Sequence, residues 1–148
     1  MLNQKSDSLL KESRFIKLAY EQAKINLGST GTNPSVGCIV EKNGSVISSA
    51  YTSLKGRPHA EFNALNKNIN FKDSNIYISL EPCSHYGKTP PCTKIIIKKK
   101  IKKVFFSIFD LDKRSKKKSL YKLRKKNIFV KNRINEKYGK KFYESYYL

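Results

Sequence analysis

The stretch EPCSHYGKTPPC, residues 81–92, places two cysteines nine positions apart, with a histidine, a lysine and two adjacent prolines between them. Prolines fix one backbone angle each, so this loop holds its side chains rigidly. The chain has three cysteines in all, Cys38, Cys83 and Cys92, and its first residues contain no apolar signal-peptide core. An odd number of cysteines in a protein that is not secreted indicates reduced thiols, and paired reduced thiols indicate a metal site.

Apolar runs on both sides of this loop predict an α/β fold. An amphipathic helix is expected over residues 13–28, with Ser13 at its start and Gly28 at its end, followed by a hairpin that turns at Asn43-Gly44. Beyond the hairpin, short apolar strands alternate with helical segments. We expect strands at 75–80, 104–109 and 128–130, and helices at 59–68, 92–101, 118–127 and 135–147. This alternation predicts a mixed, mostly parallel sheet covered by helices on both faces.

Length and composition predict a single domain over residues 1–148, large enough to bury one core. No apolar run is long enough for a membrane helix, so we expect a cytoplasmic protein without membrane contact. The net charge is +20, and residues 94–141 alone hold 20 Lys/Arg against 3 Asp/Glu. Such a segment suggests nucleic acid, but its lysines are scattered as on solvated faces. We therefore expect at most weak, non-specific binding of nucleic acid.

A second motif, PHAE at 58–61, supplies a third metal ligand and an acidic side chain to accompany the cysteine pair. His59, Cys83 and Cys92 form a three-ligand zinc set, which leaves a fourth position for water and is typical of catalytic sites. Zinc lowers the pKa of a bound water toward neutrality. Glu61 is placed to take the water proton and to pass it to a leaving amine. An H-x-E motif followed by P-C and a second cysteine is the signature of zinc deaminases.

The expected helices place these residues favourably. His59 and Glu61 fall in the first turn of one helix, and Cys92 opens another, where the helix N-terminus favours a thiolate. Cys38 lies instead on an apolar strand, so core packing is its expected role.

The spacing of the cysteines separates this chain from the nucleic-acid deaminases, whose pair is usually P-C-x-x-C. Here eight residues lie between them, and TNPSVGC (32–38) and GRPHAE (56–61) precede the loop. Together these motifs closely resemble the deaminase domain of the bacterial riboflavin-biosynthesis protein, which shows N-P-x-V-G, H-A-E and E-P-C-S-H-x-G-[RK]-T-P-P-C. The resemblance runs from about residue 13 to at least residue 108 and implies a cytidine-deaminase-like α/β/α fold.

The resemblance also implies a reaction, the hydrolytic deamination of 2,5-diamino-6-(5-phosphoribosylamino)pyrimidin-4-one with release of ammonia. It implies one zinc ion per chain on His59, Cys83 and Cys92, with Glu61 as the proton carrier. The family's substrate contacts carry over to positions matching its motifs, with Lys88 near the anionic side of the substrate. These positions are Asn33, His85, Lys88, Thr52, Asp110 and Asp112.

Two departures from the family pattern affect these contacts. Thr52 stands where many members have a histidine, so it can form a hydrogen bond but cannot carry charge. The family's D-P-[ND]-P-x-x-x-G-x-G reads DLDKRSKKKS here, at 110–119. Asp110 and Asp112 remain, but both prolines and both glycines are lost. This leaves the shape of the loop open.

The family protein commonly carries a C-terminal reductase that uses a nicotinamide cofactor. This sequence shows no Gly-rich phosphate loop and no room for a second core, so no NADPH binding is expected. The expected partners are the phosphorylated pyrimidine, a second copy of the chain in a homo-oligomer, and possible assistance from a separate reductase. Two alternatives stay open: a tRNA-editing adenosine or cytidine deaminase, and a catalytically inactive basic RNA-binding domain. An intact Glu61 with a full ligand set argues against the second.

Overall fold

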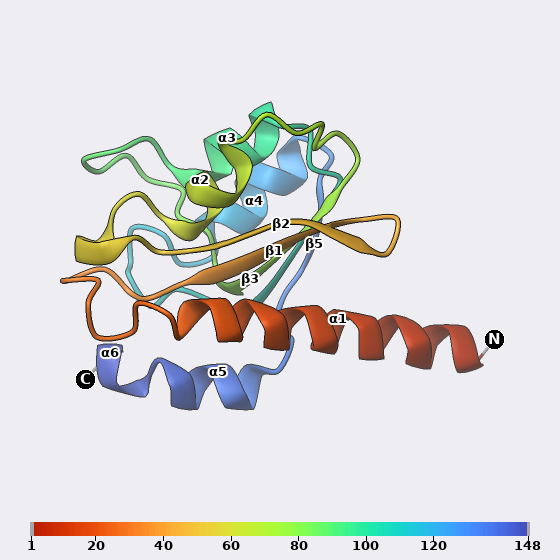
Figure 1. The fold of residues 1–148 in the computed structure, drawn as a ribbon, viewed down its shortest axis with the longest axis horizontal. Helices are drawn as coiled ribbons and strands as arrows, with labels where there is room; N and C mark the ends of the chain where they lie inside the picture. Colours follow the sequence, from red (N-terminus) through yellow and green to blue (C-terminus); the bar gives the residue numbers. More distant parts are fainter. Residues whose placement is uncertain (1, 148) are drawn as a thin grey trace.

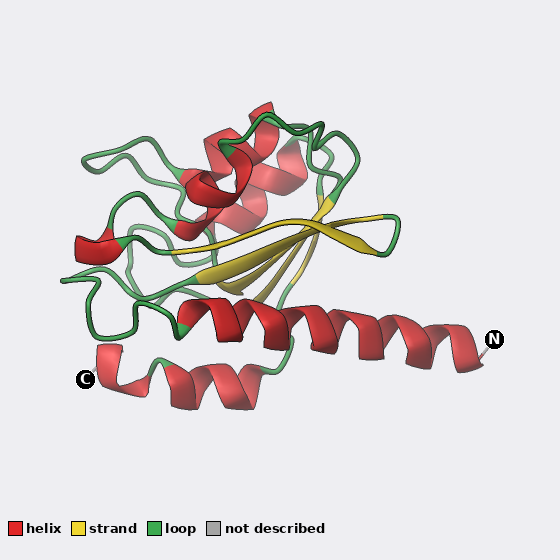
Figure 2. Cartoon of the chain, in the orientation of Figure 1, coloured by secondary structure: helices red, strands yellow, loops and turns green. Residues whose placement is uncertain are grey.

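The computed structural model describes residues 2–147, which form one five-stranded sheet with helices on both faces (Figures 1 and 2). The strands are β1 (Gly37–Lys42), β2 (Ser45–Tyr51), β3 (Asn75–Leu80), β4 (Lys103–Ile108) and β5 (Phe129–Lys131). The helices are α1 (Leu2–Ala23), α2 (Ala60–Leu65), α3 (Cys92–Lys98), α4 (Lys118–Lys125), α5 (Glu136–Phe142) and α6 (Glu144–Tyr147), with a short 3-10 helix at Leu54–Gly56.

The strand order is β2-β1-β3-β4-β5. Strand β1 is antiparallel to both β2 and β3, whereas β3, β4 and β5 are parallel neighbours. All strands except β1 therefore run in the same direction, and the expected mixed, mostly parallel sheet is confirmed. Figure 1 shows α1 and α5 on one face of this sheet and α2, α3 and α4 on the other.

The hairpin between β1 and β2 turns where the sequence predicted. Asn43 has φ 53° and Gly44 has φ 86°, which are the two positive angles of a tight hairpin turn. The Glu41 carboxylate accepts the backbone N–H of Gly44 at 2.9 Å. The turn is therefore closed by both its backbone preference and a neighbouring side chain.

Helix α1 differs from its prediction at both ends. It spans Leu2–Ala23, so Ser13 lies in its middle and donates its hydroxyl to Asn135 Oδ1 at 2.9 Å instead of capping the start. The chain leaves the helix after Ala23, and Gly28 follows in a separate turn with φ 88°. The apolar face of the helix buries Phe15, Ala19 and Ala23, whereas Leu18 and Leu27 are exposed.

Close packing of α1 on β1 depends on Gly37. A Cβ at this position would lie 1.9 Å from the carbonyl oxygen of Ala19 and 2.5 Å from the backbone nitrogen of Ala23. Both contacts involve backbone atoms, which cannot move aside. Only glycine therefore fits at the point where the helix crosses the strand.

The C-terminal helices complete the face that α1 covers. Gly139 in α5 lies against Tyr20 of α1 and Ser107 of β4, and Tyr143 is buried with its hydroxyl near Ser79. The single helix expected over residues 135–147 is instead divided into α5 and α6, with Tyr143 between them. Across residues 2–147, no helix combines the length and the apolar character that crossing a membrane requires.

Candidate active site

Three side chains from separate segments of the chain lie close together beyond the C-terminal end of β3. The ligand atoms of His59, Cys83 and Cys92 all lie within 4.8 Å of one another. His59 Nδ1 is 3.7 Å from the Cys83 sulfur and 3.5 Å from the Cys92 sulfur. Zn–N and Zn–S bonds at a tetrahedral angle would set nitrogen and sulfur about 3.6 Å apart. The donor types and their separations therefore fit a zinc ion.

The fold positions each of these donors at the end of an element. His59 is the extended residue that precedes α2, and Cys92 is the first residue of α3. Cys83 follows β3, and its loop is tied to α3 because the Thr93 N–H donates to the Cys83 carbonyl at 3.2 Å. The two adjacent prolines before Cys92 allow α3 to begin directly at that residue.

The pKa values of the Cys83 and Cys92 thiols shift in opposite directions. Hydrogen bonding from the Cys92 thiol, and then from His59, lowers the pKa of Cys83 to about 4. The same hydrogen bond, together with burial, holds the pKa of Cys92 well above its usual range. The expected effect of the α3 N-terminus therefore acts on the other cysteine, because the Cys92 N–H donates to the Cys83 sulfur at 3.1 Å. A divalent cation between the sulfurs would favour the second thiolate as well.

Glu61 lies in the first turn of α2 and is 3 % exposed. Burial raises the pKa of Glu61 to about 7, and the negative charge of Cys83 acts in the same direction. A carboxyl group in this range can accept a proton and return it near neutral pH. Its position beside the donor set and its pKa thus suit the predicted proton carrier.

A cleft of about 330 Å³ opens at this end of the sheet. It lies where β3 and β4 end, which is the usual ligand position in sheets with parallel strands. Its lining includes His59, Glu61 and Cys83, together with five of the six predicted substrate contacts: Asn33, Thr52, His85, Asp110 and Asp112. The sixth, Lys88, is exposed and lies outside the lining.

Asn33 and Thr52 are both held by backbone groups. The Asn33 amide donates to the Gly56 carbonyl at 2.9 Å. Gly56 has φ 95°, and a Cβ there would lie 2.8 Å from the Asn33 amide nitrogen. Thr52 is buried, and its hydroxyl accepts the Val36 N–H at 2.9 Å. Asn33 is thus oriented for a ligand, while the Thr52 hydroxyl is already engaged by the protein.

The loop after β4 forms one side of the cleft. His85 shares a 2.7 Å hydrogen bond with Ser115 in this loop. Asp110 accepts the Tyr147 hydroxyl at 2.7 Å, and burial raises the pKa of its carboxyl group. The Arg114 guanidinium lowers the pKa of Asp112 to about 2, so Asp112 is ionised. The cysteine loop and the loop after β4 therefore bring the predicted contacts His85, Asp110 and Asp112 into the same cleft lining.

Several lining residues were not singled out in the sequence: Arg57, Glu81, Arg114 and Tyr146. Arg57 and Glu81 lie inside the quoted motifs GRPHAE and EPC, which was the available signal. Arg114 lies in the altered loop and Tyr146 in the terminal helix α6, so no motif marked them. Cys38, by contrast, is fully buried as predicted, and its thiol donates to the Ala60 carbonyl at 3.4 Å.

Known proteins match this chain in sequence and in fold. The profile of the cytidine and deoxycytidylate deaminase zinc-binding region matches residues 10–108. A diaminohydroxyphosphoribosylamino-pyrimidine deaminase of Buchnera aphidicola (subspecies Schizaphis graminum) is 37% identical, over 91% of this chain and 95% of that protein. The riboflavin biosynthesis protein RibD of Aquifex aeolicus is 36% identical, over 92% of this chain but 38% of that protein.

A solved structure extends the match to three dimensions. The diaminohydroxyphosphoribosylaminopyrimidine deaminase/5-amino-6-(5-phosphoribosylamino)uracil reductase of Thermotoga maritima aligns with a TM-score of 0.88 at 34% identity. The alignment covers 95% of this chain and 41% of that one. The shared fold and the His-Cys-Cys set with a buried glutamate define a zinc deaminase. The chain belongs to the cytidine and deoxycytidylate deaminase family, and within it to the diaminohydroxyphosphoribosylaminopyrimidine deaminases.

Proposed function

We propose that this chain hydrolyses the ring amino group of 2,5-diamino-6-(5-phosphoribosylamino)pyrimidin-4-one and releases ammonia, as a step of riboflavin biosynthesis. The observation that carries this proposal is the His59, Cys83 and Cys92 set beside buried Glu61, on the twelve-residue cysteine loop that distinguishes this branch. The names of the Buchnera and Thermotoga relatives supply the substrate class.

In this proposal His59, Cys83 and Cys92 hold one zinc ion per chain. When bound, zinc supplies a Lewis acid that makes a water nucleophilic near neutral pH. Glu61 accepts a proton from that water and donates it to the ring nitrogen as the oxygen adds to the ring carbon; it then carries the proton of the added hydroxyl to the amine, which leaves as ammonia when the carbon–nitrogen bond breaks. Its burial keeps bulk water from competing for the proton.

The remaining predicted contacts orient the pyrimidine. Asn33 uses its amide N–H on Gly56, which leaves its carbonyl oxygen to accept a hydrogen bond from the ring. His85, Asp110 and Asp112, which also line the cleft, contact the ribosyl part in this proposal. Thr52 contributes through the shape of the cleft, because its hydroxyl is engaged by Val36. Lys88, which is exposed between the lining residues Gly87 and Thr89, adds positive charge toward the anionic end of the substrate in this proposal.

The proposal limits this chain to one step. It stops at the deaminated, unreduced ribosyl compound, and a separate reductase consumes that product. We further propose that the chain acts in the cytoplasm as a homo-oligomer, with only weak, non-specific affinity for nucleic acid. The carboxylates of Glu81, Asp110 and Asp112 in the cleft lining favour a small substrate over a polyanion.

The test combines metal analysis with turnover. Purified protein should contain one zinc per chain and release ammonia from the pyrimidine nucleotide, while the absorbance of added NADPH stays constant. Ammonia release from tRNA, but not from the nucleotide, would reject the proposal in favour of the editing alternative. NADPH oxidation in step with ammonia release would reject the single-step assignment.

A further inference from the structure

The cleft lining contains two guanidinium groups with different surroundings. Arg114 holds both carboxylate oxygens of Asp112, and the shortest of these contacts is 2.7 Å. Arg57 donates from Nη1 to the Thr89 hydroxyl at 3.2 Å. Within residues 2–147, no carboxylate forms an ion pair with Arg57. Arg57 therefore brings an uncompensated positive charge to the cleft, whereas the charge of Arg114 is neutralised locally.

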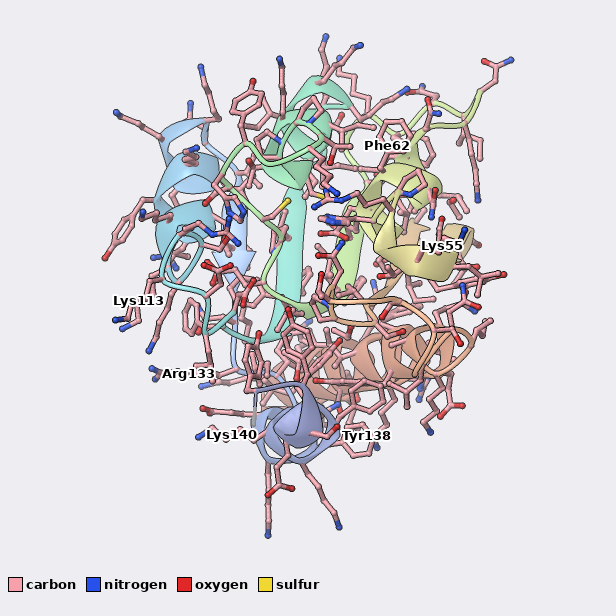
Figure 3. The ribbon with its side chains drawn as sticks, turned by 90° about the vertical axis from the view of Figure 1, so that its left-hand side faces the viewer. Lys55, Phe62, Lys113, Arg133, Tyr138 and Lys140 are labelled. Atoms are coloured by element: carbon pink, nitrogen blue, oxygen red, sulfur yellow. The ribbon has the colours of Figure 1, made fainter. Side chains whose placement is uncertain are left out.

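Different segments of the chain contribute these charges to the cleft lining. Arg57 precedes α2 and lies beside the cysteine loop, where a Cβ at Gly87 would be 3.9 Å from its Nη2 atom. The loop after β4 contributes the carboxylates Asp110 and Asp112 to the same lining, where Asp112 is paired with Arg114. Figure 3 shows Lys55 of the 3-10 helix and Lys113 of the loop after β4 on opposite sides of the view. An anionic group is attracted to the Arg57 side and disfavoured beside the two carboxylates.

The Arg57 guanidinium also has unused N–H donors that can bind a phosphate group. Its guanidinium is half-buried and uses one nitrogen on Thr89, so further N–H groups remain available. A guanidinium binds phosphate oxygens through two parallel hydrogen bonds, which a lysine cannot do. The absence of a side chain at Gly87 leaves the space beside Nη2 open.

We infer that Arg57, assisted by the Thr89 hydroxyl, binds the phosphate group of the substrate and thereby selects the phosphorylated pyrimidine over its riboside. This inference rests on the proposed function. The reacting ring carbon must lie at the His59, Cys83 and Glu61 end of the cleft, so the ribosyl phosphate extends toward its mouth. The ribosyl hydroxyls then face Asp110 and Asp112, which accept hydrogen bonds.

The test compares kcat/KM on two substrates, the phosphorylated pyrimidine and the same compound after phosphatase treatment. Arg57→Met should lower kcat/KM for the phosphorylated substrate about 10- to 100-fold, mainly through KM, as loss of a charged hydrogen-bonding group predicts. The dephosphorylated substrate should be affected less than about 3-fold. Arg57→Lys should fall between Arg57→Met and the unaltered protein. Arg14→Met removes the same charge from an exposed position on α1 and should change neither substrate.

Two results would overturn the inference. An equal loss on both substrates would mean that Arg57 acts through the neighbouring His59, and no loss on either would mean that it does not meet the substrate. Zinc content and the unfolding midpoint of each variant separate these results from misfolding. If the unaltered protein deaminates neither compound, the proposed function fails. Calorimetric titration with inorganic phosphate still decides on Arg57, because binding must then weaken at least about 10-fold in Arg57→Met.

Discussion

Glu81 should determine whether the loop after β4 keeps its place beside the cleft. Its carboxylate is 3 % exposed. Oxygen Oε1 accepts the backbone N–H groups of Asp110 at 3.2 Å and Lys117 at 3.1 Å, and Oε2 accepts the Ser119 hydroxyl at 2.5 Å. One buried side chain thus joins the cysteine loop to both ends of the 110–119 segment.

The two substitutions of Glu81 should differ sharply. Glu81→Ala leaves three donors without an acceptor, and each buried unpaired donor costs about 1–3 kcal/mol. Water that enters the vacated space can accept some of these hydrogen bonds and so reduces the total cost. We expect a loss of about 3 kcal/mol in unfolding free energy, or about 6–12 °C in Tm. Glu81→Gln keeps Oε1 for both N–H groups, and its amide can donate to Ser119 once that hydroxyl rotates. The glutamine variant should therefore lose less than about 1 kcal/mol of unfolding free energy.

Urea unfolding followed by circular dichroism, at fixed zinc and protein concentration, measures both differences. Ser119→Ala serves as the matched control, because it removes only the contact to Oε2. The alanine variant should also raise KM, since Asp110 loses its anchor. Equal destabilisation by Gln and Ala would show that the charge, not the acceptor geometry, stabilises the loop. An alanine variant as stable as the unaltered protein would refute the reasoning altogether.

Four further outcomes are expected. Cys83→Ser or Cys92→Ser should strongly weaken zinc binding, because a hydroxyl does not ionise to a soft ligand near neutral pH; full zinc occupancy in both variants by metal analysis would exclude these ligands. Glu61→Gln should keep zinc and fold but lose about 10²–10⁴-fold in kcat, and a near-normal rate of ammonia release would remove Glu61 from the mechanism. RNA affinity, measured by filter binding, should be weak and fall steeply with salt; a tight, sequence-selective tRNA complex at physiological salt would contradict it. Lys117→Gly should stabilise the protein by about 0.5–1 kcal/mol, because Lys117 has φ 64°, and a lower unfolding midpoint in urea would count against this.

The sequence predicted those parts of the fold in which local chemistry leaves few choices. Asn43-Gly44 accepts positive φ angles, so the hairpin could be placed, and the apolar run 75–80 could only be a buried strand. The start of α1 was missed because residues 3–11 are exposed on every side and show no apolar period. Ion pairs formed in the folded chain, Lys11 with Glu41 and Lys131 with Glu12, hold this part of the helix to the sheet. Such contacts leave no periodic signal.

In the site, too, some residues could be predicted from sequence motifs and others only from the folded chain. Zinc ligation restricts residue type and spacing, so the motifs were enough to bring His59, Cys83 and Cys92 together in advance of any structure. The other lining residues enter the cleft through tertiary folding. Arg57 is an ordinary surface residue type, and the role we infer for it depends on its having no ion-pair partner among residues 2–147, which only the folded chain reveals.

The altered loop at 110–119 contains a residue in the left-handed conformation that is not glycine. The family pattern has glycine where Lys117 and Ser119 stand, and Lys117 nevertheless adopts the left-handed conformation at φ 64°. The two aspartates retained from the family pattern hold the start of the loop: Asp110 accepts the Asp112 N–H at 3.0 Å, and Asp112 accepts the Arg114 N–H at 2.9 Å. The loop therefore depends on hydrogen bonds to carboxylates instead of intrinsic backbone preference. Because two of those carboxylates also line the cleft, we expect the stability of the loop and the binding of substrate to be coupled.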